Sequence, residues 1–136
     1  MVKEIVKDII FLSQKSQPAT IADKQIVQDL LDTLQANIEE CVGLAANMIG
    51  ESKRIIVVNI GVVNIPMINP IITKKSNPYQ TAEGCLSLEG MRRTTRYDMI
   101  EVEYLDEKFK KKKQIFTKGT AQVIQHEIDH CDGIVI

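Results

Sequence analysis

The sequence has few of the features that mark membrane, secreted or nucleic-acid-binding proteins. Its formal net charge is −1, so no overall attraction to nucleic acid or to a membrane surface is expected. No apolar run approaches the roughly 18 residues of a membrane span. The amphipathic N-terminal stretch carries Asp and Glu and lacks the uncharged core of a signal peptide. We therefore expect a cytoplasmic protein with no membrane partner and no specific nucleic-acid partner.

Cysteine, histidine and aromatic residues are also scarce. The three cysteines, Cys41, Cys85 and Cys131, are an odd number, which argues against a disulfide framework in a cytosolic chain. Each is then a small buried hydrophobe, a ligand or a nucleophile. The lysine run within 107–113 has no accompanying aromatic platform for nucleic acid, and it indicates a solvated hairpin end.

The length and apolar periodicity predict a domain that combines helices and strands. We expect a single catalytic domain over 1–136, since 136 residues can enclose a core. Helical spacing of apolar residues predicts an amphipathic helix over 23–42, with Asp23 as its cap and Gly43 as its stop. Strands are expected at 54–60, 98–106 and 112–117, and a helix at 119–131 before Gly133. The prolines in 65–73 predict irregular or edge pairing, 76–82 is turn-like, and 83–88 is a short apolar segment.

The chemistry of the sequence is concentrated in the last predicted helix, which contains His126-Glu127-Ile128-Asp129-His130. Two histidines four residues apart lie about 40° from each other around a helix, so both imidazoles can reach one divalent ion. Glu127 lies on the same side, where it can move a proton to and from a metal-bound water. The fold class expected is α+β, with mostly antiparallel sheets around this C-terminal metal-bearing helix and an N-terminal amphipathic helix packed on them.

A metal site of this type needs a third protein ligand, and only six residues follow His130. Cys131 points away from the face of the two histidines, so the ligand must come from upstream. Cys85 is the best candidate, because a thiolate binds Zn²⁺ or Fe²⁺ strongly and the adjacent Gly84 lets the backbone approach closely. Cys41 lies in the apolar stripe of the first helix and fits core packing better.

Three segments carry a resemblance to a known family. "EGCLS" at 83–87 and "QHEIDH" at 125–130 match two signature motifs of the peptide deformylases, and "CVGLAANM" at 41–48 resembles the third. "FLSQKSQPAT" and "MIEVEYLD" also look like the family, so the resemblance covers nearly the whole chain. It implies a metal-dependent hydrolase that removes the formyl group from N-formylmethionyl nascent polypeptides, with the ribosome exit region as a possible transient partner.

The resemblance also implies a role for each matching residue. Cys85, His126 and His130 would hold the metal, Glu127 would be the general acid and base, and the backbone N–H of Leu86 would donate to the developing oxyanion. The metal would be Fe²⁺ in the cell, with Zn²⁺, Ni²⁺ or Co²⁺ as alternatives. Substrate contacts are expected from Val42, Gly43, Met48, Glu83, Gly84, Arg92 and Val123. Glu83 has an alternative structural role, paired with Arg96, and core packing is the alternative for Val42, Gly43 and Val123.

The sequence departs from the family pattern at two points. The first motif usually ends in a glutamine whose amide stabilises the oxyanion, and here Met48 stands in its place, with Cys41 replacing the first glycine. The chain also ends earlier than most deformylases. Three hypotheses remain: a working but less efficient deformylase, a slow or divergent hydrolase acting on another formyl or acyl group, and a noncatalytic module that binds an N-terminus. The presence of Glu127 beside three metal ligands favours a catalyst.

Overall fold

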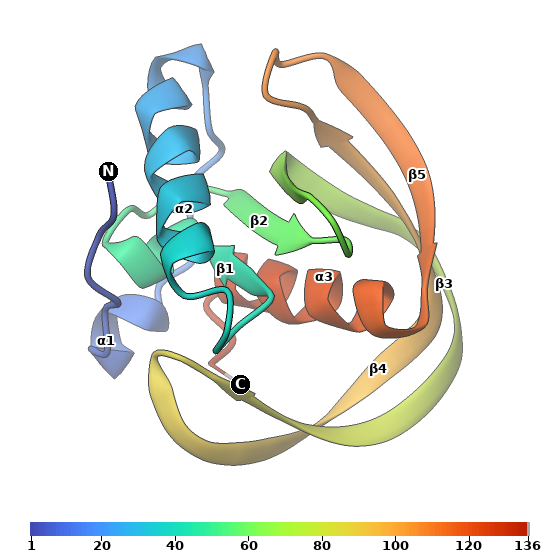
Figure 1. Ribbon diagram of the computed structural model, residues 1–136. Coiled ribbons are helices and arrows are strands. Elements are labelled where there is room, and N and C mark those ends of the chain that lie inside the picture. The colour runs from blue at the N-terminus through green and yellow to red at the C-terminus, as the bar shows by residue number, and fades with distance from the viewer. Residues whose placement is uncertain (136) are drawn as a thin grey trace.

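The computed structural model describes residues 1–135 and has five antiparallel strands in the order β1-β2-β3-β4-β5. The strands are β1 (Gly43–Ala45), β2 (Ile55–Asn59), β3 (Asn64–Cys85), β4 (Leu88–Leu105) and β5 (Lys111–Thr117). The helices are α1 (Ile9–Leu12), α2 (Lys24–Ala36) and α3 (Lys118–Cys131), with 3₁₀ turns η1 (Ile21–Asp23) and η2 (Ala46–Ile49). The predicted fold class is confirmed, and α3 lies within the curve of the long β3–β4 ribbon (Figure 1).

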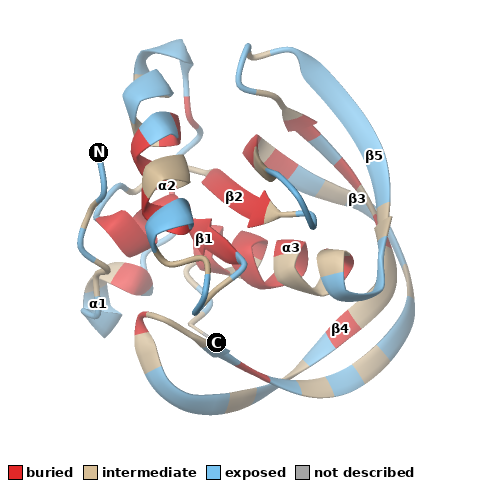
Figure 2. Ribbon diagram, in the orientation of Figure 1, coloured by how far each residue is buried: buried red, intermediate tan, exposed pale blue. Residues whose placement is uncertain are grey.

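The core lies where α2, β1, β2 and α3 meet. Leu30 and Leu34 of α2, Ile56 of β2 and Ile124 of α3 are fully buried members of one hydrophobic cluster. Burial is concentrated on these elements, whereas the outer parts of β3, β4 and β5 are mostly exposed (Figure 2). Helix α3, which carries His126 and His130, is therefore an internal element of the fold, and this explains why both histidines are buried.

The predicted helix over 23–42 is too long at its C-terminal end. The observed helix, α2, ends at Ala36. The backbone N–H of Asn37 donates to the carbonyls of Thr33 and Leu34, and its side-chain amide donates to the Thr33 carbonyl at 2.8 Å. The amides of Glu40 and Cys41 then turn back onto the Asn37 carbonyl. Cys41 consequently lies outside the helix, and its predicted place in the helical apolar stripe is wrong.

Residues 64–85 form one continuous strand, although an irregular segment, a turn and a short apolar segment were predicted there. Pro66 pairs with Val57 of β2, before the pairing with β4 begins at Ile68. Pro70 lies at a register shift, and Pro78 pairs with β4 where β2 no longer runs beside it. Each proline thus lies at a bulge or beside a single neighbouring strand, where the missing N–H does not interrupt the hydrogen bonds between strands.

The other predicted elements are confirmed. The strand at 54–60 is β2, the 98–106 strand is the second half of the longer β4, and 112–117 falls in β5. Helix α3 ends at Cys131, before Gly133 as expected, and Gly133 has a φ of 75° and donates its N–H to the carbonyl of His130. In the part of the chain that the structure describes, no helix has the length and apolar character needed to cross a bilayer.

Candidate metal centre and active site

Helix α3 brings both histidines of the motif to one buried point. His126 and His130 are 7% and 0% exposed, and their Nε2 atoms are 3.1 Å apart. Two nitrogen ligands of one tetrahedral ion at ordinary bond lengths would be separated by about 3.3 Å. The spacing in the sequence therefore produces the pair of convergent imidazoles that it predicted.

The third member of the cluster is Cys85, the last residue of β3. Its sulfur and the nitrogens of His126 and His130 all lie within 4.8 Å of one another. The chain turns at Leu86 and Ser87 and returns as β4, so Cys85 stands at the tip of a hairpin over α3. A Cβ on the preceding Gly84 would lie 3.0 Å from Met91 Sδ and 3.2 Å from the Gly90 carbonyl. A glycine is thus suited to the close packing beside the thiol.

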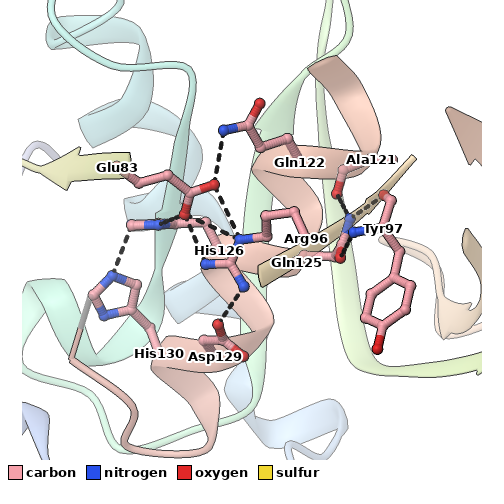
Figure 3. A network of polar contacts seen from close by, with 9 residues as sticks. All are labelled: Glu83, Arg96, Tyr97, Ala121, Gln122, Gln125, His126, Asp129 and His130. Carbon is pink, nitrogen blue, oxygen red and sulfur yellow. Dashed lines mark hydrogen bonds and ion pairs between the residues drawn. The ribbon is translucent and has the colours of Figure 1, made fainter. Parts of the chain in front are cut away.

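Glu83 fixes the orientation of the His126 ring (Figure 3). Its Oε1 lies 2.8 Å from Nδ1 of His126, and because a carboxylate only accepts hydrogen bonds, Nδ1 carries the proton. The other ring nitrogen, Nε2, is directed at the cluster. This carboxylate–histidine arrangement is characteristic of metal-binding imidazoles.

The remaining contacts of Glu83 come from β4 and α3. Arg96 donates from Nε and Nη2 at 2.7–3.1 Å, and Gln122 donates to Oε2 at 2.8 Å. The structure thus shows the Glu83–Arg96 pair suggested as the structural alternative. Burial opposes ionisation of Glu83, but the hydrogen bonds from His126, Arg96 and Gln122 outweigh it and lower its pKa to about 2. Glu83 is therefore a buried anion whose acceptors are occupied within the protein.

Burial and hydrogen bonding shift the pKa values of both histidines and of Glu127, and a metal must displace a proton from His126 to bind its Nε2. Burial lowers the pKa of His130 to about 3, so its imidazole is neutral and able to ligate. Burial also acts to lower the pKa of His126, but hydrogen bonds with Cys85 and Glu83 raise it to about 10. Burial raises the pKa of the Glu127 carboxyl to about 7.

The residues present fit a divalent metal. One thiol and two imidazoles form a donor set typical of Zn²⁺ and Fe²⁺, and three protein ligands leave a coordination position open. Glu127 Oε1 and His130 Nδ1 are buried polar atoms without a hydrogen-bond partner among residues 1–135. An unpaired carboxylate oxygen beside a three-ligand cluster is suited to proton transfer to and from a water.

A cavity of about 530 Å³ opens beside the cluster, between β1, the β3–β4 hairpin and α3. Gly43 lines this cavity and packs closely against α3. A Cβ at this position would lie 2.7 Å from Val123 Cγ1 and 3.0 Å from Glu127 Oε2. The predicted residues that line the cavity are Val42, Gly43, Met48, Glu83, Gly84, Cys85, Leu86, Val123, His126 and Glu127. The structure thus brings together nearly all of the residues singled out from the sequence.

Arg92 is the predicted substrate residue that the structure does not place among the lining residues. It pairs with Glu83 across the β3–β4 ladder, and its Nη1 is buried without a partner in the described part of the chain. The lining also includes residues that were not predicted: Cys41, Met91 and Gln122. Gln122 precedes His126 by four residues, so helical spacing could have identified it, whereas no pattern in the sequence marks Met91.

The first motif lies on the opposite side of the cavity, in β1 and η2. Met48 is 1% exposed, and its sulfur accepts the N–H of Ala45 at 3.4 Å. The Asn47 amide, the alternative oxyanion donor considered from the sequence, is instead 2.9 Å from the His130 carbonyl. Neither side chain supplies the amide that a glutamine would provide here.

A half-buried thiol and two buried imidazoles beside an unpaired carboxylate, set in a cavity, define the site of a metal-dependent hydrolase. The family described as polypeptide deformylase matches residues 2–136, and the chain belongs to this family. Over 136 residues it is 61% identical to the peptide deformylase of Clostridium beijerinckii, covering all of both chains. It is 40% identical over 128 residues to that of Pelotomaculum thermopropionicum, covering 91% of this chain and 81% of the relative.

Solved structures agree with this membership. The peptide deformylase of Thermotoga maritima superposes with a TM-score of 0.89 at 28% identity, over 99% of this chain and 95% of that one. A Met-Ala-Ser-bound class I type b peptide deformylase from Acinetobacter baumannii has a TM-score of 0.89 at 26% identity, over 99% and 97% of the two chains. The chain is therefore a hydrolase with peptide deformylase function, and the relatives give no support to the divergent or noncatalytic alternatives.

Proposed function

We propose that the chain removes the formyl group from N-formylmethionyl peptides with Cys85, His126 and His130 as metal ligands. The observation that carries the proposal is the convergence of these three side chains beside Glu127 in the cavity. Cys85, His126 and His130 would hold a divalent ion, which when bound would lower the pKa of a water to near neutrality. Hydrolysis then yields formate and a peptide with a free amino terminus.

Glu127 carries the proton in this reaction. Its side chain lines the cavity, and Oε1 has no competing hydrogen bond within the described residues. It takes a proton from the attacking water and returns it to the leaving amine, so that both steps use one carboxyl group. The formyl oxygen gains negative charge during attack, and we assign the backbone N–H of Leu86 as its donor, since Leu86 follows Cys85 and lines the cavity.

The apolar part of the cavity suits the methionine side chain. Val42, Met48 and Val123 present aliphatic or thioether groups around Gly43. We assign the extended peptide to the space between Gly43 and Gly84, where the absence of side chains leaves backbone groups accessible. Glu83 is removed from the proposed substrate contacts, because His126, Arg96 and Gln122 occupy its carboxylate.

Fe²⁺ is our proposal for the metal in the cell, with Ni²⁺, Co²⁺ or Zn²⁺ able to replace it. The Cys85 thiolate and both imidazoles suit all of these ions, and a ferrous–thiolate site is sensitive to oxygen because both partners oxidise. Nascent formylated chains are the substrates that this reaction requires. We therefore also propose a cytoplasmic location, with transient proximity to the ribosome exit region.

The test uses protein purified without oxygen and loaded with Fe²⁺, Co²⁺ or Ni²⁺. Formate release from formyl-Met-Ala-Ser is expected with each metal, and acetate release from acetyl-Met-Ala-Ser is the matched control. Absence of formate from the metal-loaded protein would refute deformylation, and equal rates on both peptides would support the divergent acyl hydrolase. Cys85→Ser should lose tight metal binding, and full metal retention would contradict the ligand assignment.

A further inference from the structure

We propose that Asp129 is a positioning residue that acts through Arg96 and Glu83 to hold His126 in its ligating orientation, and so slows metal release from the site. The inference rests on the ligand assignment of the proposed function. The contacts that carry it form a closed circuit from α3 to β4, across to β3 and back to α3 (Figure 3).

The first contact joins α3 to β4. Asp129 follows His126 by three residues on the same helix, and its Oδ2 accepts a hydrogen bond from Arg96 Nη1 at 2.6 Å. The Arg96 side chain is 4% exposed, whereas that of Asp129 is 22% exposed. A buried guanidinium needs partners for its charge and its donors. Asp129 therefore holds the end of Arg96 that Glu83 does not reach.

The second contact fixes the Glu83 carboxylate. Arg96 reaches it through Nε and Nη2, so the guanidinium binds both oxygens in a fork at 2.7–3.1 Å. Paired contacts of this kind determine the orientation of the carboxylate as well as its position. Because Nη1 is bound to Asp129, the guanidinium group of Arg96 cannot turn without breaking hydrogen bonds to Glu83 or to Asp129.

The third contact reaches the ligand. Glu83 Oε1 holds Nδ1 of His126 at 2.8 Å, and this leaves Nε2 directed at the cluster. Glu83 also precedes Cys85 by two residues in the same strand, so the carboxylate links the strand that carries the thiol to the helix that carries the imidazoles. Loosening Arg96 is expected to free both the His126 ring and the hairpin tip, and partners of this kind change metal affinity by about 10–100-fold when removed.

A second aspartate, Asp132 at the C-terminal cap of α3, provides a matched control. Asp132 also pairs with an arginine, since Arg54 Nη1 lies 2.8 Å from its Oδ1, but this pair joins the helix end to the start of β2. The described contacts of Arg54 include none with Glu83 or with the metal-binding side chains. Asp129→Asn and Asp132→Asn therefore each remove one helix–arginine ion pair, and only the first lies in the circuit to His126.

The experiment loads each full-length protein with Co²⁺ and follows loss of its thiolate absorption band after a chelator is added. Asp129→Asn should release Co²⁺ about tenfold faster than wild type, while Asp132→Asn releases it at the wild-type rate. Gln122→Ala, which removes another contact of Glu83, should give an intermediate rate, and Arg96→Lys should accelerate release as Asp129→Asn does. Thermal unfolding of the metal-free proteins checks that each is folded.

Two outcomes would overturn the proposal. Equal release rates for wild type and Asp129→Asn would show that the circuit does not hold His126, and equal acceleration in both asparagine variants would indicate a general weakening of α3. If Asp129→Asn does not fold, the Gln122→Ala rate decides, because an unchanged rate again contradicts the inference. A wild-type protein without a Co²⁺–thiolate band would instead refute the ligand assignment on which the proposed function depends.

Discussion

The side-chain amide of Asn47 donates a hydrogen bond to the backbone carbonyl of His130 at 2.9 Å, and the same nitrogen lies 3.4 Å from the Leu12 carbonyl. Asn47 thus ties η2 to the last turn of the metal-motif helix. Its amide is committed away from the oxyanion position, so it does not compensate for the glutamine that Met48 replaces. We therefore expect the oxyanion to be stabilised by the proposed metal and by the backbone N–H of Leu86.

This arrangement predicts that Met48→Gln accelerates deformylation. Loss of one oxyanion donor costs about 10²–10³ in kcat in another enzyme class, so restoring an amide should raise kcat by about tenfold or more. The measurement is formate release by wild type and variant loaded with the same metal. Met48→Leu, which conserves size without a donor, should remain near the wild-type rate, and an unchanged rate for Met48→Gln would mean that another group already donates.

Asn47→Ala is expected to destabilise the protein rather than to alter the oxyanion site directly. The substitution removes one of the donors to the His130 carbonyl, which keeps the N–H of Gly133, at a cost of about 0.5–1.5 kcal/mol in the free energy of unfolding. Urea unfolding of the metal-free protein measures the loss. Asn37→Ala is the control, because its amide also donates to a carbonyl, that of Thr33, but at a more accessible helix end. An equal or larger loss in Asn37→Ala would contradict the importance of the Asn47 tether.

Gly43→Ala should reduce activity because of crowding against α3. The added Cβ would lie 2.7 Å from Val123 Cγ1 and 3.0 Å from Glu127 Oε2, so Val123 must move and the carboxylate must give by a few tenths of an ångström. A displacement of about 1 Å in a reacting group can cost about 10²-fold in rate, so we expect this smaller shift to lower kcat for formate release by about tenfold. Val123→Ala in the same chain should restore part of it.

Gly119→Ala is the matched control for that substitution. A Cβ there has no heavy atom within 4 Å, and Gly119 lies inside α3. Alanine is preferred to glycine in a helix by about 0.5–1 kcal/mol, so this variant should be slightly more stable and fully active. Equal activities for Gly43→Ala and Gly119→Ala would show that the close approach at Gly43 does not position Glu127.

Cys41 lines the cavity but should react slowly with electrophiles. Burial raises the pKa of its thiol to about 11, so on the order of one thiol in a thousand is ionised at pH 8. Iodoacetamide labelling of Cys41, mapped by mass spectrometry, should rise about tenfold per pH unit between pH 8 and 10. Cys131, whose pKa burial raises to about 12, should be labelled only after unfolding. Labelling of Cys41 at pH 7 at the rate of a free cysteine would contradict this account.

Much of the candidate site could be predicted because its signals are local in the sequence. The i, i+4 spacing of His126 and His130 dictates their common face on a helix, and the thiol of Cys85 beside Gly84 marks the third candidate ligand. The contacts around Glu83 were harder to predict, because Gln122 reaches Glu83, and Asp129 reaches Arg96, only after β3, β4 and α3 pack together. The role of the Asn47 amide likewise depends on a contact with the far end of the chain.

The fold was predictable where periodicity is simple and was missed where tertiary pairing overrides local preference. Helix α3 has an apolar stripe and a glycine stop, so its bounds could be read within about a residue. Strand β3 contains Pro66, Pro70 and Pro78, which locally predict interruption, and their tolerance depends on which neighbour each one faces. The end of α2 depends on the capping contacts of Asn37, which the apolar spacing does not indicate.

The most direct test of the account measures metal content and formate release together in Glu127→Gln. The amide has nearly the shape of the carboxyl group but cannot accept and return a proton, and Glu127 is not among the three residues of the ligand cluster. The account predicts a full complement of bound metal and a decrease in kcat of about 10²–10⁴ on formyl-Met-Ala-Ser. Formate release at the wild-type rate from the metal-loaded variant would contradict the central claim that Glu127 carries the proton.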